Sequence, residues 1–192
     1  MTGLIILAAG SSNRLGKPKQ NLIFNGQTLL QRAIKTALQV NCGPVVVVLG
    51  GNVDLIKPTL ENSAADVIFN ADWQQGMSST IRTGIQYLQQ NYPDVTSVIL
   101  MLCDQPFVDA AVLQKLIPAN KQGAIIASGY DDTIGPPVFF DRYYFDELSA
   151  LKGNEGAKHL LLKYKEKIVT VPFELGSVDI DTAEDFEKLT GI

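Results

Sequence analysis

Three basic residues, Arg14, Lys17 and Lys19, gather in one short segment near the start of the chain. They follow the run Leu7 to Gly10, whose small residues would let a ligand approach the main chain closely. Basic side chains beside open backbone amides are a common way to bind phosphate groups. The segment therefore predicts a polyphosphate-binding loop between a strand and a helix. A solvated basic turn is the simpler alternative interpretation.

This loop follows neither of the two best-known phosphate-binding patterns. A Walker A loop has four residues between its glycines and a Ser or Thr after its lysine. Here Gly10 and Gly16 enclose five residues, and Pro18 follows Lys17. The loop also lacks the GxGxxG spacing of a dinucleotide-binding turn. Neither standard motif accounts for this segment.

Residues 7–20, LAAGSSNRLGKPKQ, resemble the opening signature of nucleotidyltransferases that join a nucleoside triphosphate to a phosphorylated acceptor. The resemblance is in particular to the molybdenum cofactor cytidylyltransferases and guanylyltransferases. It implies that Arg14 and Lys19 hold the triphosphate during catalysis. It also implies a main-chain floor for the base and ribose, formed by Leu7, Ala8, Ala9 and Gly10.

Residues 70–79, NADWQQGMSS, resemble a segment of the cytidylyl branch of this family. The resemblance implies that CTP is the nucleotide and that four further residues bind it, namely Asn70, Gly76, Met77 and Ser78. The residues themselves support this role, since Gly76 to Ser78 would open a helix whose free amides could contact a base edge. Trp73 alone is more typical of core packing than of base stacking.

The resemblance also implies a magnesium site built from two carboxylates. Residues 102–106, LCDQP, are similar to a family pattern in which the aspartate, here Asp104, holds Mg²⁺. A lone aspartate at a strand end more often caps a turn. Residues 179–185, DIDTAED, resemble a second family segment, with alanine in place of proline. Asp181 aligns with the second metal ligand, and Asp179 is the reserve, because both could share one face of a strand.

Two other segments, Gly135 to Phe140 and Gly153 to Lys158, resemble the acceptor side of the family site. In the first, Pro136 stands where some members have histidine, so an acceptor contact from an imidazole is missing. His159, the only histidine, lies in an apolar helical stretch and is expected to pack or to face solvent. Cys103 has no visible basic partner and is expected to be a small buried residue.

Together these motifs predict a Mg²⁺-dependent transfer of CMP from CTP to a phosphorylated acceptor, by resemblance molybdopterin, with in-line attack and release of pyrophosphate. A molybdoenzyme or its chaperone would be the partner that receives the product. Three alternatives stay open: a guanylyltransferase, a sugar- or alditol-phosphate cytidylyltransferase, and a carrier that holds a finished nucleotide cofactor without turnover. The sequence shows no Ser-His-Asp or Cys-His arrangement for covalent acyl chemistry.

The elements that must position these residues follow from an alternation of apolar runs. Five short runs are expected to be strands: Leu4–Leu7, Val45–Leu49, Val67–Phe69, Val98–Leu102 and Ala124–Ala127. Stripes at helical spacing follow Thr28, Ser79 and Asp109, and a last helix begins near Thr182 with Asp185 as a cap. The pattern predicts an α/β fold with a mostly parallel sheet covered on both faces. The family resemblance implies a three-layer, Rossmann-like fold of the nucleotide-diphospho-sugar transferase type, with a mostly parallel sheet.

Length and composition fit one globular domain over residues 1–192. Apolar residues make up 46% and charged residues 19% of the chain, which is not the composition of a disordered protein. The formal charge of −4 argues against a surface that binds nucleic acid or anionic lipid. Because the apolar runs are too short to cross a bilayer and Cys42 and Cys103 form no CxxC pair, we expect a cytoplasmic protein.

Overall fold

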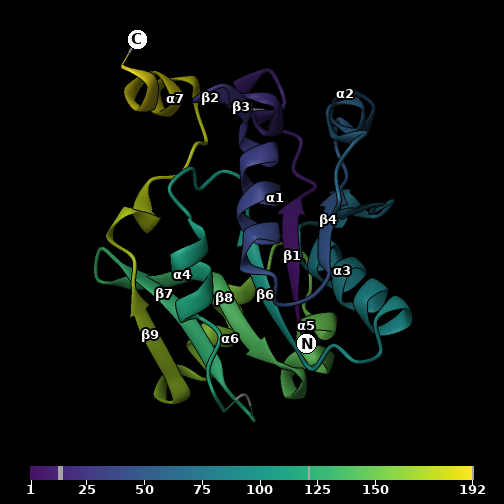
Figure 1. The fold of residues 1–192 in the computed structure, drawn as a ribbon, viewed down its shortest axis with the longest axis vertical. Helices are drawn as coiled ribbons and strands as arrows, with labels where there is room; N and C mark the ends of the chain where they lie inside the picture. The colour runs from purple at the N-terminus through teal and green to yellow at the C-terminus, as the bar shows by residue number, and fades with distance from the viewer. Residues whose placement is uncertain (13–14, 121, 192) are drawn as a thin grey trace.

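The computed structural model describes residues 1–12, 15–120 and 122–191 (Figure 1). Its centre is a seven-stranded sheet with the strand order β5-β4-β1-β6-β8-β7-β9. The strands are β1 (Thr2–Ala8), β4 (Val45–Leu49), β5 (Asp66–Phe69), β6 (Ser97–Leu102), β7 (Ile125–Tyr130), β8 (Thr133–Asp141) and β9 (Ile168–Pro172). Neighbouring strands are parallel except that β8 runs antiparallel to β6 and β7. The predicted α/β fold with a mostly parallel sheet is confirmed.

Helices cover both faces of the sheet, which gives the molecule three layers (Figure 1). They are α1 (Leu29–Val40), α2 (Val53–Ile56), α3 (Met77–Asn91), α4 (Ala110–Lys115), α5 (Phe145–Ala150), α6 (Ala157–Lys163) and α7 (Ala183–Thr190). Helices α1 and α4 pack on one face, and α3, α5 and α6 pack on the other. In β1, Leu4 and Ile6 face the α1 side while Ile5 and Leu7 face the α3 side, which explains the continuous apolar run. None of the helices formed by the described residues is long and apolar enough to cross a membrane.

Side-chain caps fix the starts of three helices. Before α1, Thr28 Oγ1 accepts from Gln31 N at 3.1 Å and Gln31 Oε1 accepts from Thr28 N at 3.0 Å, which forms a capping box. Asp109 caps α4 with its carboxylate. Thr182 and Asp185 form the capping box of α7, so the predicted capping role of Asp185 is confirmed.

Strand β8 is one of the strands that the apolar runs did not predict. It contains the segment Gly135 to Phe140 and occupies the middle of the sheet. The pairing of β7 with β8 shifts register between Ala127 and Ser128, which leaves Pro136 and Pro137 out of the ladder. A proline has no N–H to donate to a neighbouring strand. The two prolines therefore conceal a central strand from prediction by sequence pattern.

Candidate functional site

Three loops meet at one edge of the sheet. Strands β1, β4, β5 and β6 are parallel, so their carboxyl ends point to the same edge. This is the end of the molecule that carries α7 and the small hairpin of β2 (Ile23–Phe24) and β3 (Gln27–Thr28) (Figure 1). In open α/β sheets ligands bind at this edge. The loops that follow β1, β5 and β6 carry most of the residues that the sequence assigns to the site.

Lys19 lies between two of the predicted metal ligands. Its Nζ donates one hydrogen bond to Asp104 Oδ2 and a second, of 3.0 Å, to Asp181 Oδ1. The side chain of Lys19 is 18% exposed and that of Asp104 is 10% exposed. Burial alone would lower the pKa of the Lys19 ammonium, but the adjacent Asp104 charge and the two hydrogen bonds hold that pKa above its ordinary value. Lys19 is therefore fully charged, whereas Arg14, its expected partner at the triphosphate, lies outside the described residues.

The main chain brings the C-terminal segment to Asp104. Ile180 N donates to Asp104 O at 3.1 Å, and the Ile180 side chain is buried in a small cluster with Leu22 and Leu29. Residues 179–181 form no strand, which corrects the expectation of two aspartates alternating on a strand face. The second carboxylate is positioned by the buried Ile180 side chain and one backbone hydrogen bond, and not by strand pairing.

The two candidates for the second carboxylate lie differently. Asp181 accepts from Lys19, whereas Asp179 lines a separate pocket together with Lys188. Partial burial and the negative charges of Asp104 and Asp181 raise the pKa of Asp179 above its ordinary value. The geometry favours Asp181 over Asp179 as the partner of Asp104.

The donor set around Asp104 fits a divalent cation. Asp104 Oδ1 is buried and accepts no hydrogen bond from any residue that the structure describes. A buried acceptor of this kind costs free energy unless a donor or a cation binds it. Within residues 1–12, 15–120 and 122–191, no group of three or more His, Cys, Asp or Glu side chains could hold a metal by itself. Two carboxylates completed by phosphate oxygens are, however, a common environment of Mg²⁺.

Gln20 shapes the loop that follows β1. Its side chain is fully buried, and Nε2 donates to Ala8 O at 2.9 Å and to Gly10 O at 3.0 Å. The Lys19 amide donates to Ser12 Oγ at 3.0 Å. These hydrogen bonds fold the loop back onto the end of β1 and thereby bring Lys19 to the aspartates.

A cleft of about 340 Å³ opens beside this loop. It is lined by Leu7, Ala9, Gly10, Ser11, Trp73, Gln74, Gly76, Met77, Thr80 and Asn154. These residues come from the end of β1 with its loop, from the turn and first residues of α3, and from the loop before α6. Five of the predicted nucleotide-binding residues line the cleft, namely Leu7, Ala9, Gly10, Gly76 and Met77. The cleft therefore lies where the sequence resemblance expects the base and ribose.

Of the other five predicted nucleotide-binding residues, Arg14 lies outside the described residues, and Lys19, Ala8, Asn70 and Ser78 are not among the residues that line the cleft. Asn70 is 2% exposed, and its Nδ2 donates to Ser79 Oγ at 2.8 Å while its Oδ1 accepts from Asp72 N at 3.0 Å. The Ser78 amide donates to Gly153 O at 3.2 Å, so it is already used within the protein. Asn70 and Ser78 thus stabilise the turn before α3 through buried hydrogen bonds, and neighbouring residues form the surface of the cleft.

The sequence does not by itself single out Gln20, Thr80 or Asn154. Gln20 acts through two backbone carbonyls, and Thr80 lies inside a helical stripe. Asn154 comes from a loop that the resemblance places on the acceptor side. The signal that could have found it is the pair Gly153 and Gly156, since paired glycines often mark a close approach of two backbone segments.

Cys103 and His159, to which the sequence analysis gives no chemical role, lie where it expects them. Cys103 is buried, and burial together with the charge of Asp104 raises the pKa of its thiol to about 12. Its thiolate is therefore disfavoured at neutral pH. His159 is half-exposed on α6, with Nδ1 3.7 Å from Glu155 Oε1. Neither residue has the environment of a nucleophile.

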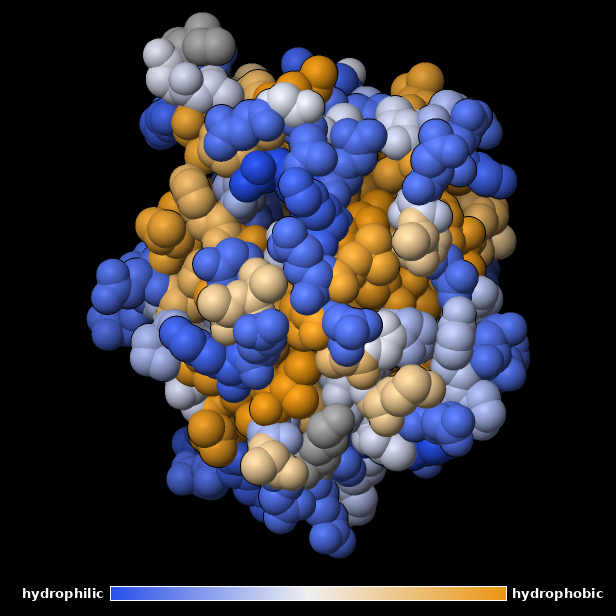
Figure 2. Space-filling model, in the orientation of Figure 1, coloured by the Kyte–Doolittle hydropathy of each residue, from blue (hydrophilic) through white to orange (hydrophobic). Residues whose placement is uncertain are grey.

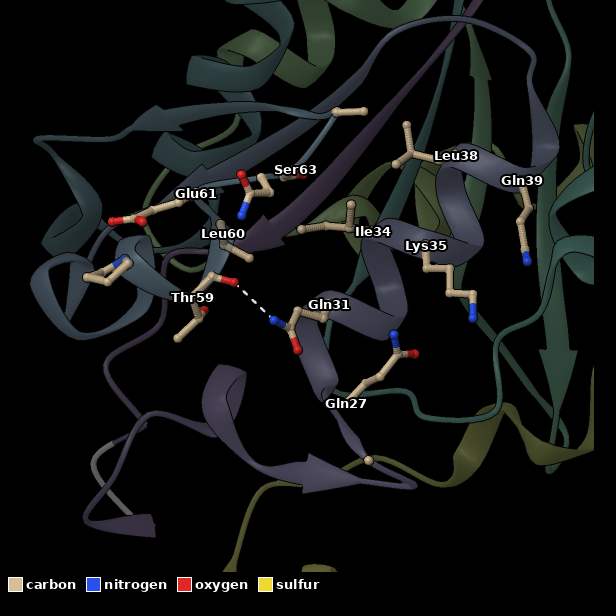
Figure 3. Close-up of a pocket in the computed structure, with 14 residues that line it drawn as sticks. Gln27, Gln31, Ile34, Lys35, Leu38, Gln39, Thr59, Leu60, Glu61 and Ser63 are labelled. Carbon is tan, nitrogen blue, oxygen red and sulfur yellow. Dashed lines mark hydrogen bonds between the residues drawn. The ribbon is translucent and has the colours of Figure 1, made fainter.

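A more spacious groove, of about 860 Å³, lies along α1 on the face shown in Figure 2, where apolar surface in orange borders the helix. Figure 3 shows Gln31, Ile34 and Leu38 of α1 on one side of this groove and Leu60 on the other. Gln31 Nε2 spans it and donates to Thr59 O at 3.0 Å. The groove contains none of the residues around Lys19, and we assign no chemistry to it.

Comparison with known proteins places the chain in a family. A family model described as the MobA-like NTP transferase domain matches residues 4–168. The nicotine blue oxidoreductase of Paenarthrobacter nicotinovorans is 26% identical over 196 residues, which cover 96% of this chain and 94% of that protein. The molybdenum cofactor cytidylyltransferase of Escherichia coli strain K12 is 26% identical over 184 residues, which cover 95% of this chain and 92% of that protein.

Solved structures extend the similarity to the whole fold. The crystal structure of Rv0371c from Mycobacterium tuberculosis H37Rv matches with a TM-score of 0.85 at 29% identity and covers 100% of this chain and 97% of that chain. Its complex with manganese matches with a TM-score of 0.81 at 28% identity and covers 98% and 97% of the two chains. Because the family model extends from β1 to the start of β9, the protein belongs to the MobA-like NTP transferase domain family and is by family a nucleotidyltransferase.

Proposed function

We propose that the protein transfers CMP from CTP to a phosphorylated acceptor, molybdopterin, and releases pyrophosphate. The observation that carries this proposal is the position of Lys19 between Asp104 and Asp181 at the edge of the sheet where the cleft opens. A cation and two carboxylates suit a nucleoside triphosphate that binds together with a divalent metal. The similarity to the E. coli molybdenum cofactor cytidylyltransferase supports CTP and molybdopterin as the two substrates. The segment Gly76 to Ser78, which resembles the cytidylyl branch, also supports CTP by analogy with the family.

The reaction needs alignment more than it needs a protein nucleophile. An oxygen of the acceptor phosphate attacks the α-phosphorus of CTP and forms a new P–O bond. The bond from the α-phosphorus to the oxygen of the β-phosphate breaks, and pyrophosphate leaves with its electron pair. Because the attacking phosphate is already an anion, no general base is required. The protein must hold the reacting groups in line and balance the charge that grows on pyrophosphate.

Each part of the site has a task in this scheme. Lys19, with Arg14 on the same loop, balances the charge of the triphosphate and of the departing pyrophosphate. The floor from Leu7 to Gly10 and the wall of Gly76 and Met77 hold the base and ribose. Asn70 and Ser78 act as positioning residues, since they fix the turn from which that wall is built.

Asp104 and Asp181 are the residues that would hold a divalent cation, Mg²⁺ in our proposal. The orphan oxygen Asp104 Oδ1 supports this assignment, as does the manganese complex of Rv0371c. When bound, the cation neutralises charge on the phosphate oxygens. A cation at these carboxylates would compete with Lys19 for them, which would leave the Lys19 ammonium to the phosphates.

Other functions could use the same site. A guanylyltransferase would use GTP in place of CTP. A sugar- or alditol-phosphate cytidylyltransferase would use another acceptor, and a cofactor carrier would bind its ligand without turnover. The relative named nicotine blue oxidoreductase belongs to another activity class. The groups gathered around Lys19 are those that bind phosphates and cations, which favours nucleotidyl transfer. With molybdopterin as acceptor, the product would pass to a molybdoenzyme or its chaperone.

The test is an assay of the purified protein with CTP labelled on its α-phosphate, Mg²⁺ and molybdopterin. We expect the label to appear on the acceptor together with released pyrophosphate. Parallel reactions replace CTP by GTP, ATP or UTP, and molybdopterin by a sugar phosphate or an alditol phosphate. Turnover only with another nucleotide or acceptor would correct that part of the proposal. No pyrophosphate in any reaction would overturn nucleotidyl transfer itself.

A further inference from the structure

The loop between α5 and α6 forms one wall of the cleft. Residues 152–156 close a tight turn, in which Glu155 N donates to Lys152 O at 3.0 Å and Glu155 Oε2 accepts from Lys152 N at 2.8 Å. The Ser78 amide donates to Gly153 O at 3.2 Å, which ties this turn to the first residues of α3. The loop is therefore held in place by the same segment that carries the predicted base-binding residues.

Two glycines let this loop lie directly on the start of α3. Gly76 has a φ of +95°, and a Cβ there would lie 2.4 Å from Asn154 Oδ1 and 2.5 Å from Gly153 O. A Cβ on Gly156 would lie 2.7 Å from Met77 Sδ. At Gly76 the contact with the Gly153 backbone leaves no room for a side chain, whereas at Gly156 the Met77 side chain would have to move. The close approach is what brings Asn154 to the wall of the cleft.

Asn154 presents a side-chain amide whose hydrogen-bonding groups are unused. Its side chain forms no hydrogen bond with any residue that the structure describes. Thr80, another polar residue of the cleft, already accepts from Asn70 Nδ2 at 3.3 Å. An asparagine amide has two N–H donors and a carbonyl acceptor. Such a pair of groups can bind the edge of a base, including that of cytosine, where an amino donor lies beside a ring-nitrogen acceptor.

We propose that Asn154 contacts the base of the bound nucleotide, which is cytosine in the proposed function. This inference rests on the proposed function, because it takes the cleft as the base-binding part of the site. It assigns a role in base binding to the loop of residues 152–156, which is far along the chain from both nucleotide motifs. Among the residues that the structure describes, Gln74 carries the second side-chain amide on the cleft and is the natural comparison.

The experiment measures binding of three ligands by calorimetry in the presence of Mg²⁺ and without acceptor. The ligands are CTP, GTP and inorganic tripolyphosphate, which has the phosphates but no base. We expect Asn154→Ala to weaken CTP binding about 5- to 10-fold, as for one or two lost hydrogen bonds, and to change the affinity for tripolyphosphate less than about twofold. The GTP affinity shows whether the contact depends on the base. Gln74→Ala tests the second amide. Asn62→Ala removes an exposed asparagine from the groove along α1 and is the matched control.

The outcomes separate this inference from the function on which it rests. Equal CTP affinities of Asn154→Ala and the wild type would overturn the inference and leave the proposed function in place. So would a CTP loss confined to Gln74→Ala. An equal loss of CTP and tripolyphosphate in Asn154→Ala would indicate a damaged loop and also overturns it. Wild-type protein that binds none of the three ligands would overturn both proposals.

Discussion

Lys19 balances two carboxylates that would otherwise repel each other. Asp104 and Asp181 both accept from its ammonium, and Asp104 is almost completely buried. A divalent cation at these carboxylates would bring two positive charges where the Lys19 ammonium brings one. Because breaking a partly buried ion pair leaves an uncompensated charge, the buried Asp104 carboxylate needs a cation beside it. Lys19 and a metal ion are therefore competitors for the same oxygens.

This competition predicts that Lys19→Met binds Mn²⁺ more tightly than the wild type when no nucleotide is present. Removing a positive charge from the two carboxylates should raise the affinity by roughly tenfold or more. Titration followed by the electron paramagnetic resonance of free Mn²⁺ measures this directly. Lys17→Met, an exposed lysine on the same loop, is the matched control and should leave the affinity unchanged. Weaker Mn²⁺ binding by Lys19→Met would show that the lysine assists the metal and does not compete with it.

Asp104→Asn should abolish most turnover while nucleotide binding is retained. The amide is isosteric with the carboxylate, and the bond from Ile180 N to the main-chain oxygen of residue 104 stays intact. Loss of one transition-state contact typically lowers the rate about 100- to 1000-fold. Rates of pyrophosphate release and calorimetry with CTP give the two quantities. Asp132→Asn alters an exposed aspartate in the turn between β7 and β8 and should leave both unchanged. Unimpaired turnover in Asp104→Asn would exclude this carboxylate from the reaction.

At the scale of elements, the site depends on how closely the loop before α6 meets the start of α3. Gly76 serves as the N-cap of α3 in a conformation that side chains rarely adopt, and the neighbouring loop occupies the space a side chain would need. Gly76 therefore couples the shape of the cleft to the local packing of two elements that are distant in sequence.

Gly76→Ala should reduce both the stability of the protein and its affinity for CTP. Backbone strain alone costs about 1–3 kcal/mol, and displacement of Asn154 and Gly153 would add to it. Gly123→Ala separates the two effects, because Gly123 also has a positive φ of +65° but no described atom lies within 4 Å of its added Cβ. We expect the control to lose some stability and no CTP affinity. Urea denaturation measures the stability of each variant, and calorimetry measures its CTP affinity. Equal losses of CTP affinity in the two variants would contradict the coupling.

At the scale of the whole molecule, the parts of the fold that follow a single local pattern were predictable. Apolar runs gave the positions of β1, β4 and β6, since strands covered on both faces need apolar residues throughout. Strand β8 was missed because Pro136 and Pro137 interrupt its ladder. Strand β9 was also missed, although Ile168 to Val171 are all β-branched, and it lies beside β7 at the end of the sheet.

The site was predictable to the extent that it lies on continuous motifs. The resemblance identified Lys19, Asp104 and Asp181, and the structure brings these three together. It could not supply the position of Asn154, because that depends on two glycine contacts between segments far apart in the chain. It also assumed a strand at residues 179–181, where the buried side chain of Ile180 does the positioning. Contacts that only tertiary packing creates were beyond the reach of the motifs.

The site joins both ends of the chain, since Lys19 follows the first strand and Asp181 precedes the last helix. A ligand that binds there should therefore stabilise the whole fold against heat. We expect CTP and Mg²⁺ together to raise the melting temperature by more than the sum of their separate effects, because phosphate oxygens complete the ligand set of the metal and the metal offsets the phosphate charge. At a ligand concentration of a hundred times the dissociation constant, the free energy of unfolding rises by about 2.7 kcal/mol. For a chain of this size that raises the melting temperature by roughly 5–11 °C. Asp181→Asn should lose the extra shift and keep that of CTP alone. Strictly additive shifts in the wild type would argue against a shared nucleotide and metal site.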